Sequence, residues 1–155
     1  EIPQIGKIDI PIWFKYSCMS VPLLLNELYK KMLLIRYFEE GVLKLFEQGK
    51  LFGTTHPYIG QEANAVGVIT NLKKSDIVVS NHRCHGHYIT HKQNPYALLC
   101  EMMGKKDGLC AGRGGSQHIW DDGFFSNGVL GGIMPLAAGL AFSEKFNKAL
   151  YFIIS

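Results

Sequence analysis

Long apolar runs are absent from this sequence of 155 residues. The apolar stretches Val21–Leu25 and Tyr151–Ile154 are far shorter than the roughly 20 residues that a membrane-spanning helix needs. A basic tract is also missing, because the 16 Lys and Arg residues are interspersed with 13 Asp and Glu residues, for a net charge of +3. Nucleic-acid binding usually requires clustered positive charge. We therefore expect neither a membrane nor a nucleic acid as partner.

The four cysteines form no C-x-x-C pair and no zinc-finger spacing. This favours free thiols in a reducing compartment, and hence a cytoplasmic protein. Common nucleotide and zinc-protease motifs are missing as well: G-x-x-x-x-G-K-[S/T], strand-linked G-x-G-x-x-G and H-E-x-x-H. Any active site must therefore be built from other residues.

The composition is typical of a globular domain, with 47% hydrophobic and 19% charged residues. Apolar residues at helical spacing predict a long helix that starts after Pro22 and ends at Gly49. The run Ile77–Ser80 predicts a short buried strand. Further predicted elements are helices over 61–71, 95–103 and 135–146, a loop over 104–132, and a buried parallel strand over 150–154. This order predicts a layered α/β domain over 24–155, preceded by an N-terminal arm over 1–23.

Three polar segments of this domain are candidates for a binding site. His56 precedes a predicted helix start, and Pro57 restricts the chain beside it. The segment Asn81–His87 follows the strand, where ligands bind in open α/β sheets. Two glycine-rich stretches, Gly112–His118 and Ser126–Gly132, could bring backbone N–H groups close to a ligand.

Each segment also has other interpretations. The loop at His56 could be a surface loop followed by a helix cap, and the glycines could serve turns only. In the segment after the strand, Arg83 suits bidentate binding of a phosphate or carboxylate. A metal site is the alternative, with four histidines as ligands: His82, His85, His87 and His91. We expect these side chains to point in different directions on a strand-and-turn segment, which disfavours the metal.

Taken together, the segments resemble the alpha subunits of the thiamine-diphosphate-dependent 2-oxo acid dehydrogenases and acetoin dehydrogenases. The shared pattern is H-x-x-x-G-Q-E-A, R-C-H-G, G-x-G-G-S-x-H, N-G-x-x-G and P-L-A-x-G-x-A, in this order. It lies here at His56–Ala63, Arg83–Gly86, Gly112–His118, Asn127–Gly131 and Pro135–Ala141. The resemblance covers residues 24–155 and implies the N-terminal portion of a thiamine-diphosphate-binding fold, a parallel sheet flanked by helices that is incomplete in this chain.

The resemblance implies roles for five residues. His56 resembles the catalytic histidine that contacts the reacting substrate. Arg83 resembles the arginine that binds the cofactor diphosphate, and His82 occupies the neighbouring cofactor-binding position. Gly128 and Leu130 match the backbone positions that contact the aminopyrimidine ring. His82 together with the His-Gly-His run at 85–87 is more similar to the acetoin type than to the pyruvate type.

The resemblance also implies cofactors and partners. Thiamine diphosphate would be bound with Mg2+, whose G-D-G motif is expected to begin directly after Ser155, so no metal ligand is assigned within the 155 residues and this piece alone is expected to be inactive. A beta subunit would supply the glutamate that activates the pyrimidine, in a hetero-oligomer. The acyl group, derived from a 2-oxo acid or from acetoin, would pass to a lipoyl-bearing acyltransferase.

Two other functions are compatible with the sequence. The chain could be a non-catalytic assembly module that keeps the fold without the metal motif, and the apolar arm around Trp13 suits contact with another chain. A zinc hydrolase using the histidine cluster is the third hypothesis, and it would contain bound metal.

Overall fold

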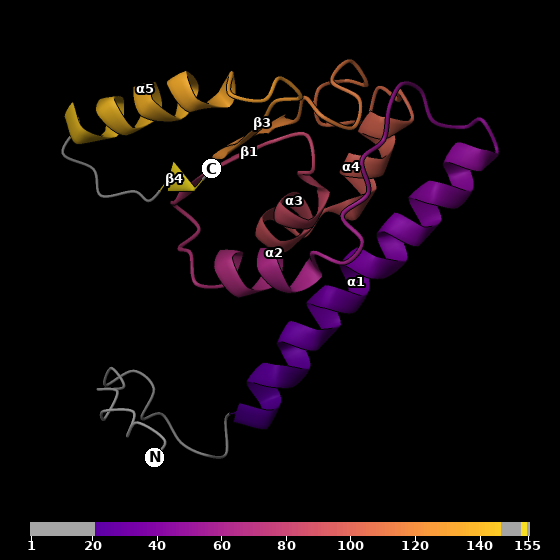
Figure 1. Ribbon diagram of the computed structural model, residues 1–155, viewed down its shortest axis with the longest axis horizontal. Coiled ribbons are helices and arrows are strands. Elements are labelled where there is room, and N and C mark those ends of the chain that lie inside the picture. Colours follow the sequence, from indigo (N-terminus) through magenta and orange to yellow (C-terminus); the bar gives the residue numbers. More distant parts are fainter. Residues whose placement is uncertain (1–20, 147–152, 155) are drawn as a thin grey trace, which may run out of the picture.

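The computed structural model describes residues 21–146 and 153–154, which form a mixed α/β structure (Figure 1). Residues 1–20 of the predicted N-terminal arm and most of the last predicted strand lie outside these residues, whereas residues 21–23 of the arm belong to the first helix. The described elements follow in the order α1 (Val21–Glu47), α2 (Glu62–Ile69), β1 (Ile77–Ser80), α3 (His85–Lys92), α4 (Pro95–Met102), β2 (Trp120–Asp121), β3 (Phe124–Ser126), α5 (Ile133–Phe146) and β4 (Ile153–Ile154).

The sheet has the strand order β2-β3-β1-β4, with β3 and β4 both parallel to β1. Ser80 at the end of β1 pairs with Ser126 at the end of β3, and the N–H of Asn127 donates to the Ser80 carbonyl over 3.2 Å. The chain therefore leaves both strands at the same edge. This edge is where open α/β sheets bind ligands.

Helices cover the sheet on both sides in Figure 1, with α5 along one side and α2 and α3 along the other. The core lies on the α2/α3 side, where α1 packs across both helices. Its largest buried side chains include Ile35 of α1, Tyr88 of α3 and Phe124 of β3. The burial of these apolar surfaces, rather than helix propensity, holds the short helices in place.

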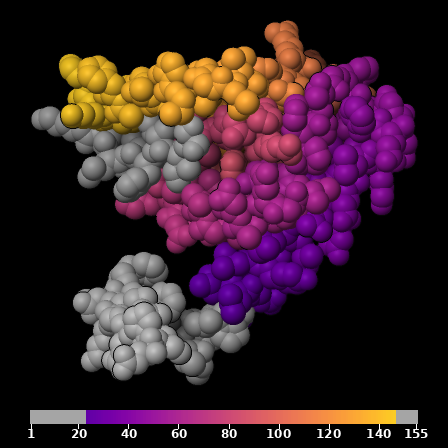
Figure 2. Space-filling model, in the orientation of Figure 1, coloured from indigo at the N-terminus to yellow at the C-terminus, as the bar shows by residue number. Residues whose placement is uncertain are grey.

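The first turns of α1 stand away from this core (Figure 2). Leu23, Leu24, Leu25 and Tyr29 are each more than half exposed there. The other end of α1 is at Glu47, and Gly49, two residues later, has a φ of 67°, the left-handed conformation predicted from the sequence. No helix among the described residues is long and apolar enough to cross a bilayer.

Two parts of the fold differ from the sequence prediction. The segment after β1 is not a strand and turn throughout, because α3 begins at His85. Its sequence, HGHYITHK, contains poor helix formers, so tertiary burial of Tyr88 and Ile89 overrides propensity. The predicted loop over 104–132 contains the hairpin β2–β3, whose strands pair Asp121 with Phe124 around a two-residue turn.

Candidate functional site

His56 meets the residues that follow β1. Its ring lies edge-on to the ring of His82, with centroids 4.8 Å apart and planes at 81°. Arg83 Nη1 donates to the carbonyl oxygen of Pro57 over 2.7 Å. The loop before α2 and the segment after β1 are thus joined at two successive residues on each side. Three of the five predicted site residues, His56, His82 and Arg83, therefore lie together.

Arg83 is held by its backbone as well as by its side chain. Its N–H donates to Asn81 Oδ1 over 2.8 Å, a short turn that directs the chain into α3. Apart from Pro57, the described residues provide no hydrogen-bond partner for the guanidinium group. Its remaining N–H donors can bind a phosphate or carboxylate at the start of a helix, where anions are favoured.

Gly128 also belongs to this group, because the side chain of Gln117 lies near both Gly128 and His56. Gln117 Nε2 lies 3.3 Å from the Thr54 carbonyl oxygen and 3.4 Å from His56 Nδ1. A Cβ added at Gly128 would overlap Gln117 Oε1 and lie 3.3 Å from Gln117 Cδ. The glycine-rich loop, the turn after β3 and the His56 loop therefore converge, although they are far apart in the sequence.

Leu130, the fifth predicted residue, is on the same turn as Gly128 but its side chain is 71% exposed. Its neighbour Val129 is also exposed, and the Val129 N–H donates to Asn127 Oδ1 over 2.9 Å. The structure does not bring the Leu130 side chain to His56. The role predicted for Leu130 is one of its backbone, so its exposed side chain does not contradict it.

The electrostatic environment keeps His56 neutral. Desolvation lowers the pKa of His56 first, and repulsion from His82, Arg83 and His85 lowers it further. The imidazole of His56 is therefore uncharged near pH 7. A neutral imidazole has one donor and one acceptor, so it can position or protonate a substrate oxygen only through one of its two nitrogens.

A buried pair beneath the site was missed in the sequence. Glu39 of α1 and His85 of α3 are both fully buried, with Glu39 Oε1 2.8 Å from His85 Nδ1. His85 Nε2 lies 3.0 Å from the Ser116 carbonyl oxygen, which only accepts, so Nε2 carries a proton. The pair ties α1 and α3 to the glycine-rich loop. Its sequence signal was Glu39 itself, a carboxylate on the same helical face as Ile35 and Val42.

The glycine-rich loop is organised by a second buried carboxylate that the sequence did not reveal. Glu101 of α4 accepts hydrogen bonds from the backbone N–H groups of Cys110, Gly112 and Gly114 over 2.6, 2.9 and 2.6 Å. Our prediction that the stretch Gly112–His118 offers its N–H groups to a ligand is therefore wrong for Gly112 and Gly114. They bind the protein's own carboxylate.

The four-histidine metal site conflicts with the positions of the rings. His85 is held between Glu39 and Ser116, whereas His87 lies 2.8 Å from both Tyr58 Oη and Ser80 Oγ. Burial lowers the pKa of His87 to about 4, in keeping with a neutral ring inside this chain of hydroxyl groups. Within 21–146 and 153–154, no group of three or more His, Cys, Asp or Glu side chains could hold a metal ion.

The cysteine of the R-C-H-G sequence, Cys84, is also structural. It is fully buried, and desolvation raises the pKa of its thiol to about 12, so it is no nucleophile near pH 7. Cys84, Cys100 and Cys110 are all free thiols.

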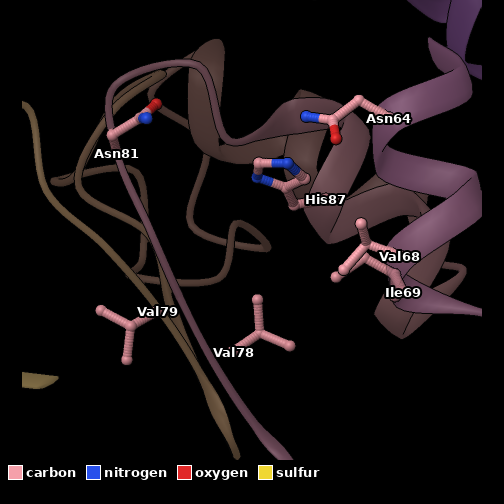
Figure 3. Close-up of a pocket in the computed structure, with 7 residues that line it drawn as sticks. All are labelled: Asn64, Val68, Ile69, Val78, Val79, Asn81 and His87. Atoms are coloured by element: carbon pink, nitrogen blue, oxygen red, sulfur yellow. The ribbon is translucent and has the colours of Figure 1, made fainter. Parts of the chain in front are cut away.

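A separate cavity of about 300 Å³ lies beside the end of β1 (Figure 3). Asn81, Asn64 and His87 form its polar end, and four aliphatic residues line the rest: Val68, Ile69, Val78 and Val79. None of the five predicted site residues lines it. The candidate site is therefore the junction of the loops around His56, rather than this cavity.

Comparison with known proteins agrees with the motifs. Residues 30–154 match the family described as dehydrogenase E1 component. The alpha subunit of acetoin:2,6-dichlorophenolindophenol oxidoreductase from Bacillus subtilis is 45% identical over 124 residues, which are 78% of this chain and 37% of the relative. The pyruvate dehydrogenase E1 alpha subunit of Zymomonas mobilis is 41% identical over 128 residues, 80% of this chain and 36% of the relative.

A mitochondrial relative extends the match further along this chain. The pyruvate dehydrogenase E1 alpha subunit of Kluyveromyces lactis is 36% identical over 140 residues, 90% of this chain and 33% of the relative. The chain spans about a third of the length of these relatives. The resemblance inferred from the motifs is confirmed: the chain belongs to the dehydrogenase E1 component family.

Proposed function

We propose that this chain is part of the alpha subunit of a thiamine-diphosphate-dependent dehydrogenase. The enzyme decarboxylates a 2-oxo acid or cleaves acetoin and passes the acyl group to a lipoyl carrier. Family membership and the names of the pyruvate and acetoin relatives support this activity. The observation that carries the site is the meeting of His56, His82, Arg83 and Gly128 at the edge where β1 and β3 end.

The residues at this edge fit the cofactor. His82 Nδ1 is buried without a hydrogen-bond partner, which is costly for the folded protein and suits a bound polar atom. The guanidinium group of Arg83 has donors left for diphosphate oxygens. Both features support the thiamine-diphosphate-binding fold, with residues 24–155 as the N-terminal portion of that domain and residues 1–23 as a preceding arm.

Each residue then has one task. Arg83 binds the diphosphate and His82 contacts the cofactor beside it, while the backbone at Gly128 and Leu130 faces the aminopyrimidine. Bound thiamine diphosphate would supply the nucleophilic carbon for chemistry at the substrate carbonyl. His56 donates a hydrogen bond to the substrate oxygen as negative charge develops there, which stabilises the transition state.

Other parts of the enzyme complete the site. Mg2+ would supply positive charge to the diphosphate and would be held by the family's G-D-G motif, which the 155 residues do not contain, and a beta subunit would supply the glutamate that activates the pyrimidine. Glu62 is not that glutamate, because its carboxylate is engaged by Arg36 Nε over 2.7 Å and by the Gly60 N–H over 3.0 Å. We expect a hetero-oligomer that delivers acyl groups to a lipoyl-bearing acyltransferase. The free thiols support a cytoplasmic enzyme.

The proposal is tested on the full-length subunit assembled with its beta-type partner. Reduction of 2,6-dichlorophenolindophenol is measured with pyruvate, branched 2-oxo acids and acetoin, with and without thiamine diphosphate and Mg2+. We expect cofactor-dependent reduction with one substrate class. An assembly module would instead form the complex and give no cofactor-dependent reduction with any of them, which would overturn the proposal.

Arg83→Lys tests the diphosphate contact in the same complex. Lysine keeps the charge but loses the planar fork, so we expect the Kd for thiamine diphosphate to rise about tenfold or more. Isothermal titration measures this Kd. The matched control is Arg113→Lys on the exposed loop surface, which should leave the Kd unchanged. Equal affinities for wild type and Arg83→Lys would remove Arg83 from the cofactor site.

A further inference from the structure

The amide of Gln117 has only one orientation that its neighbours allow. Its nitrogen lies 3.3 Å from the Thr54 carbonyl oxygen, and a carbonyl oxygen only accepts hydrogen bonds. The amide oxygen would repel that carbonyl, so the nitrogen must face it. The oxygen consequently points toward Gly128, where the missing side chain leaves the room it occupies.

This orientation determines which nitrogen of His56 carries the proton. The same amide nitrogen lies 3.4 Å from His56 Nδ1, and an amide nitrogen only donates. Nδ1 must therefore accept, which leaves it without a proton. In a neutral imidazole the proton then resides on Nε2.

We propose that Gln117 is a positioning residue that holds His56 in the tautomer protonated on Nε2. This inference rests on the proposed function, in which His56 donates a hydrogen bond to the substrate oxygen. The tautomer makes Nε2 the donor and keeps Nδ1 turned toward the protein. Thr54 and Gly128 support this role, because the Thr54 carbonyl oxygen orients the amide of Gln117 and Gly128 leaves space for the amide oxygen.

The charged and titratable groups around His56 act in the same direction. His82 faces it edge-on, Arg83 follows on the segment after β1, and His85 lies beneath, and each of them disfavours a positive charge on His56. These groups lower the pKa of His56 but do not distinguish its two nitrogens. Gln117 adds the directional contact, because an amide N–H facing Nδ1 opposes a proton at that atom.

The test replaces Gln117 in the assembled full-length enzyme. In Gln117→Glu a carboxylate of the same shape can accept a hydrogen bond from a protonated Nδ1 and so favours a proton there, whereas Gln117→Met removes the contact without adding charge. Gln48→Glu makes the same charge change at an exposed position and is the matched control. Diethylpyrocarbonate, which modifies only unprotonated imidazole, is applied over a pH series, and modification of His56 is quantified by peptide mass spectrometry.

We expect the midpoint of His56 modification to rise by about one pH unit or more in Gln117→Glu. It should rise less in Gln117→Met and remain unchanged in Gln48→Glu. The kcat of Gln117→Glu should fall about tenfold, with an unchanged Kd for thiamine diphosphate and an acid limb shifted with the modification midpoint. An unmoved midpoint in Gln117→Glu would overturn the inference.

The modification measurement needs no turnover, so the two proposals can fail separately. A shifted midpoint in a complex that reduces no dye with any substrate retains the role of Gln117 and overturns the proposed activity. An active enzyme with an unmoved midpoint does the reverse.

Discussion

Two loop regions of this protein differ in whether their hydrogen-bonding groups find partners within the protein. In the stretch after α4, the N–H groups of Cys110, Gly112 and Gly114 all bind Glu101, a fully buried carboxylate. At the edge where β1 and β3 end, Arg83 has donors left and His82 Nδ1 has no partner among the described residues. What distinguishes a structural loop from a binding site here is whether the protein itself satisfies the donors.

The comparison predicts that substitutions at the edge where β1 and β3 end alter catalysis and leave the stability of the protein intact. His56 is only partly buried and its ring contacts are few, so His56→Ala should change the free energy of unfolding by less than about 1 kcal/mol. Loss of the hydrogen bond to the substrate oxygen should lower kcat about a hundredfold or more. Steady-state kinetics and cofactor titration of the assembled enzyme measure both effects.

The expected pattern for His56→Ala is a low kcat with an unchanged Kd for thiamine diphosphate. Equal turnover in variant and wild type would exclude His56 from the chemistry. A parallel loss of cofactor affinity would mean that His56 supports the binding site instead.

Substitution of Glu101, which binds the loop after α4, should lower the stability of the protein and leave catalysis intact. Glu101→Gln keeps the shape of the side chain but places an amide nitrogen against backbone N–H groups that need an acceptor. Loss of charge-assisted hydrogen bonds at a buried site should reduce the free energy of unfolding by about 3 kcal/mol. Urea denaturation of the full-length subunit measures it, with Glu40→Gln on the exposed face of α1 as the control.

A Glu101→Gln variant as stable as the Glu40→Gln control would contradict the assignment of Glu101 as the organiser of its loop. The contrast between the loop after α4 and the edge where β1 and β3 end would then rest on geometry alone.

The elements that the sequence predicted well are those with local signals. The helical spacing of apolar residues predicted α1, the short apolar run predicted β1, and Pro95 marked the start of α4. Asn94 Oδ1 also caps α4, because it accepts a hydrogen bond from the Ala97 N–H over 3.1 Å. The hairpin β2–β3 had a signal that we did not use, the Asp122-Gly123 pair typical of a two-residue turn, with φ of 70° at Gly123. Local chemistry was therefore sufficient for most of the fold.

The candidate site was only partly predictable. His56, His82, Arg83 and Gly128 came from motifs in fixed order, and the structure brings them together. Gln117 could not be assigned a role, because it is separated from His56 by 61 positions and acts only through the tertiary fold. Glu101 likewise has no local signal, since its partners are set by the path of a loop with an exposed left-handed residue, Ala111, at φ 54°.

A pair of helical glycines provides the smallest and most closely matched test of what positions the loop that carries His56. A Cβ at Gly86 of α3 would overlap the ring of Tyr58, which is 1% exposed and precedes α2 in the loop that carries His56. A Cβ at Gly67 of α2 would meet nothing within 4 Å. Gly86→Ala should therefore cost about 1–3 kcal/mol through overpacking, whereas Gly67→Ala should stabilise the protein by up to about 1 kcal/mol.

Gly86→Ala should also affect catalysis, because the displaced Tyr58 ring moves the loop whose Pro57 carbonyl is held by Arg83. Since His87 joins Tyr58 Oη to Ser80 Oγ, a shift of the ring disturbs the end of β1 too. Thermal denaturation and kcat of both variants measure the two consequences. If Gly86→Ala were as stable and as active as Gly67→Ala, the Tyr58 contact would not determine the position of His56, and the hydrogen bond from Arg83 to Pro57 would have to hold that loop on its own.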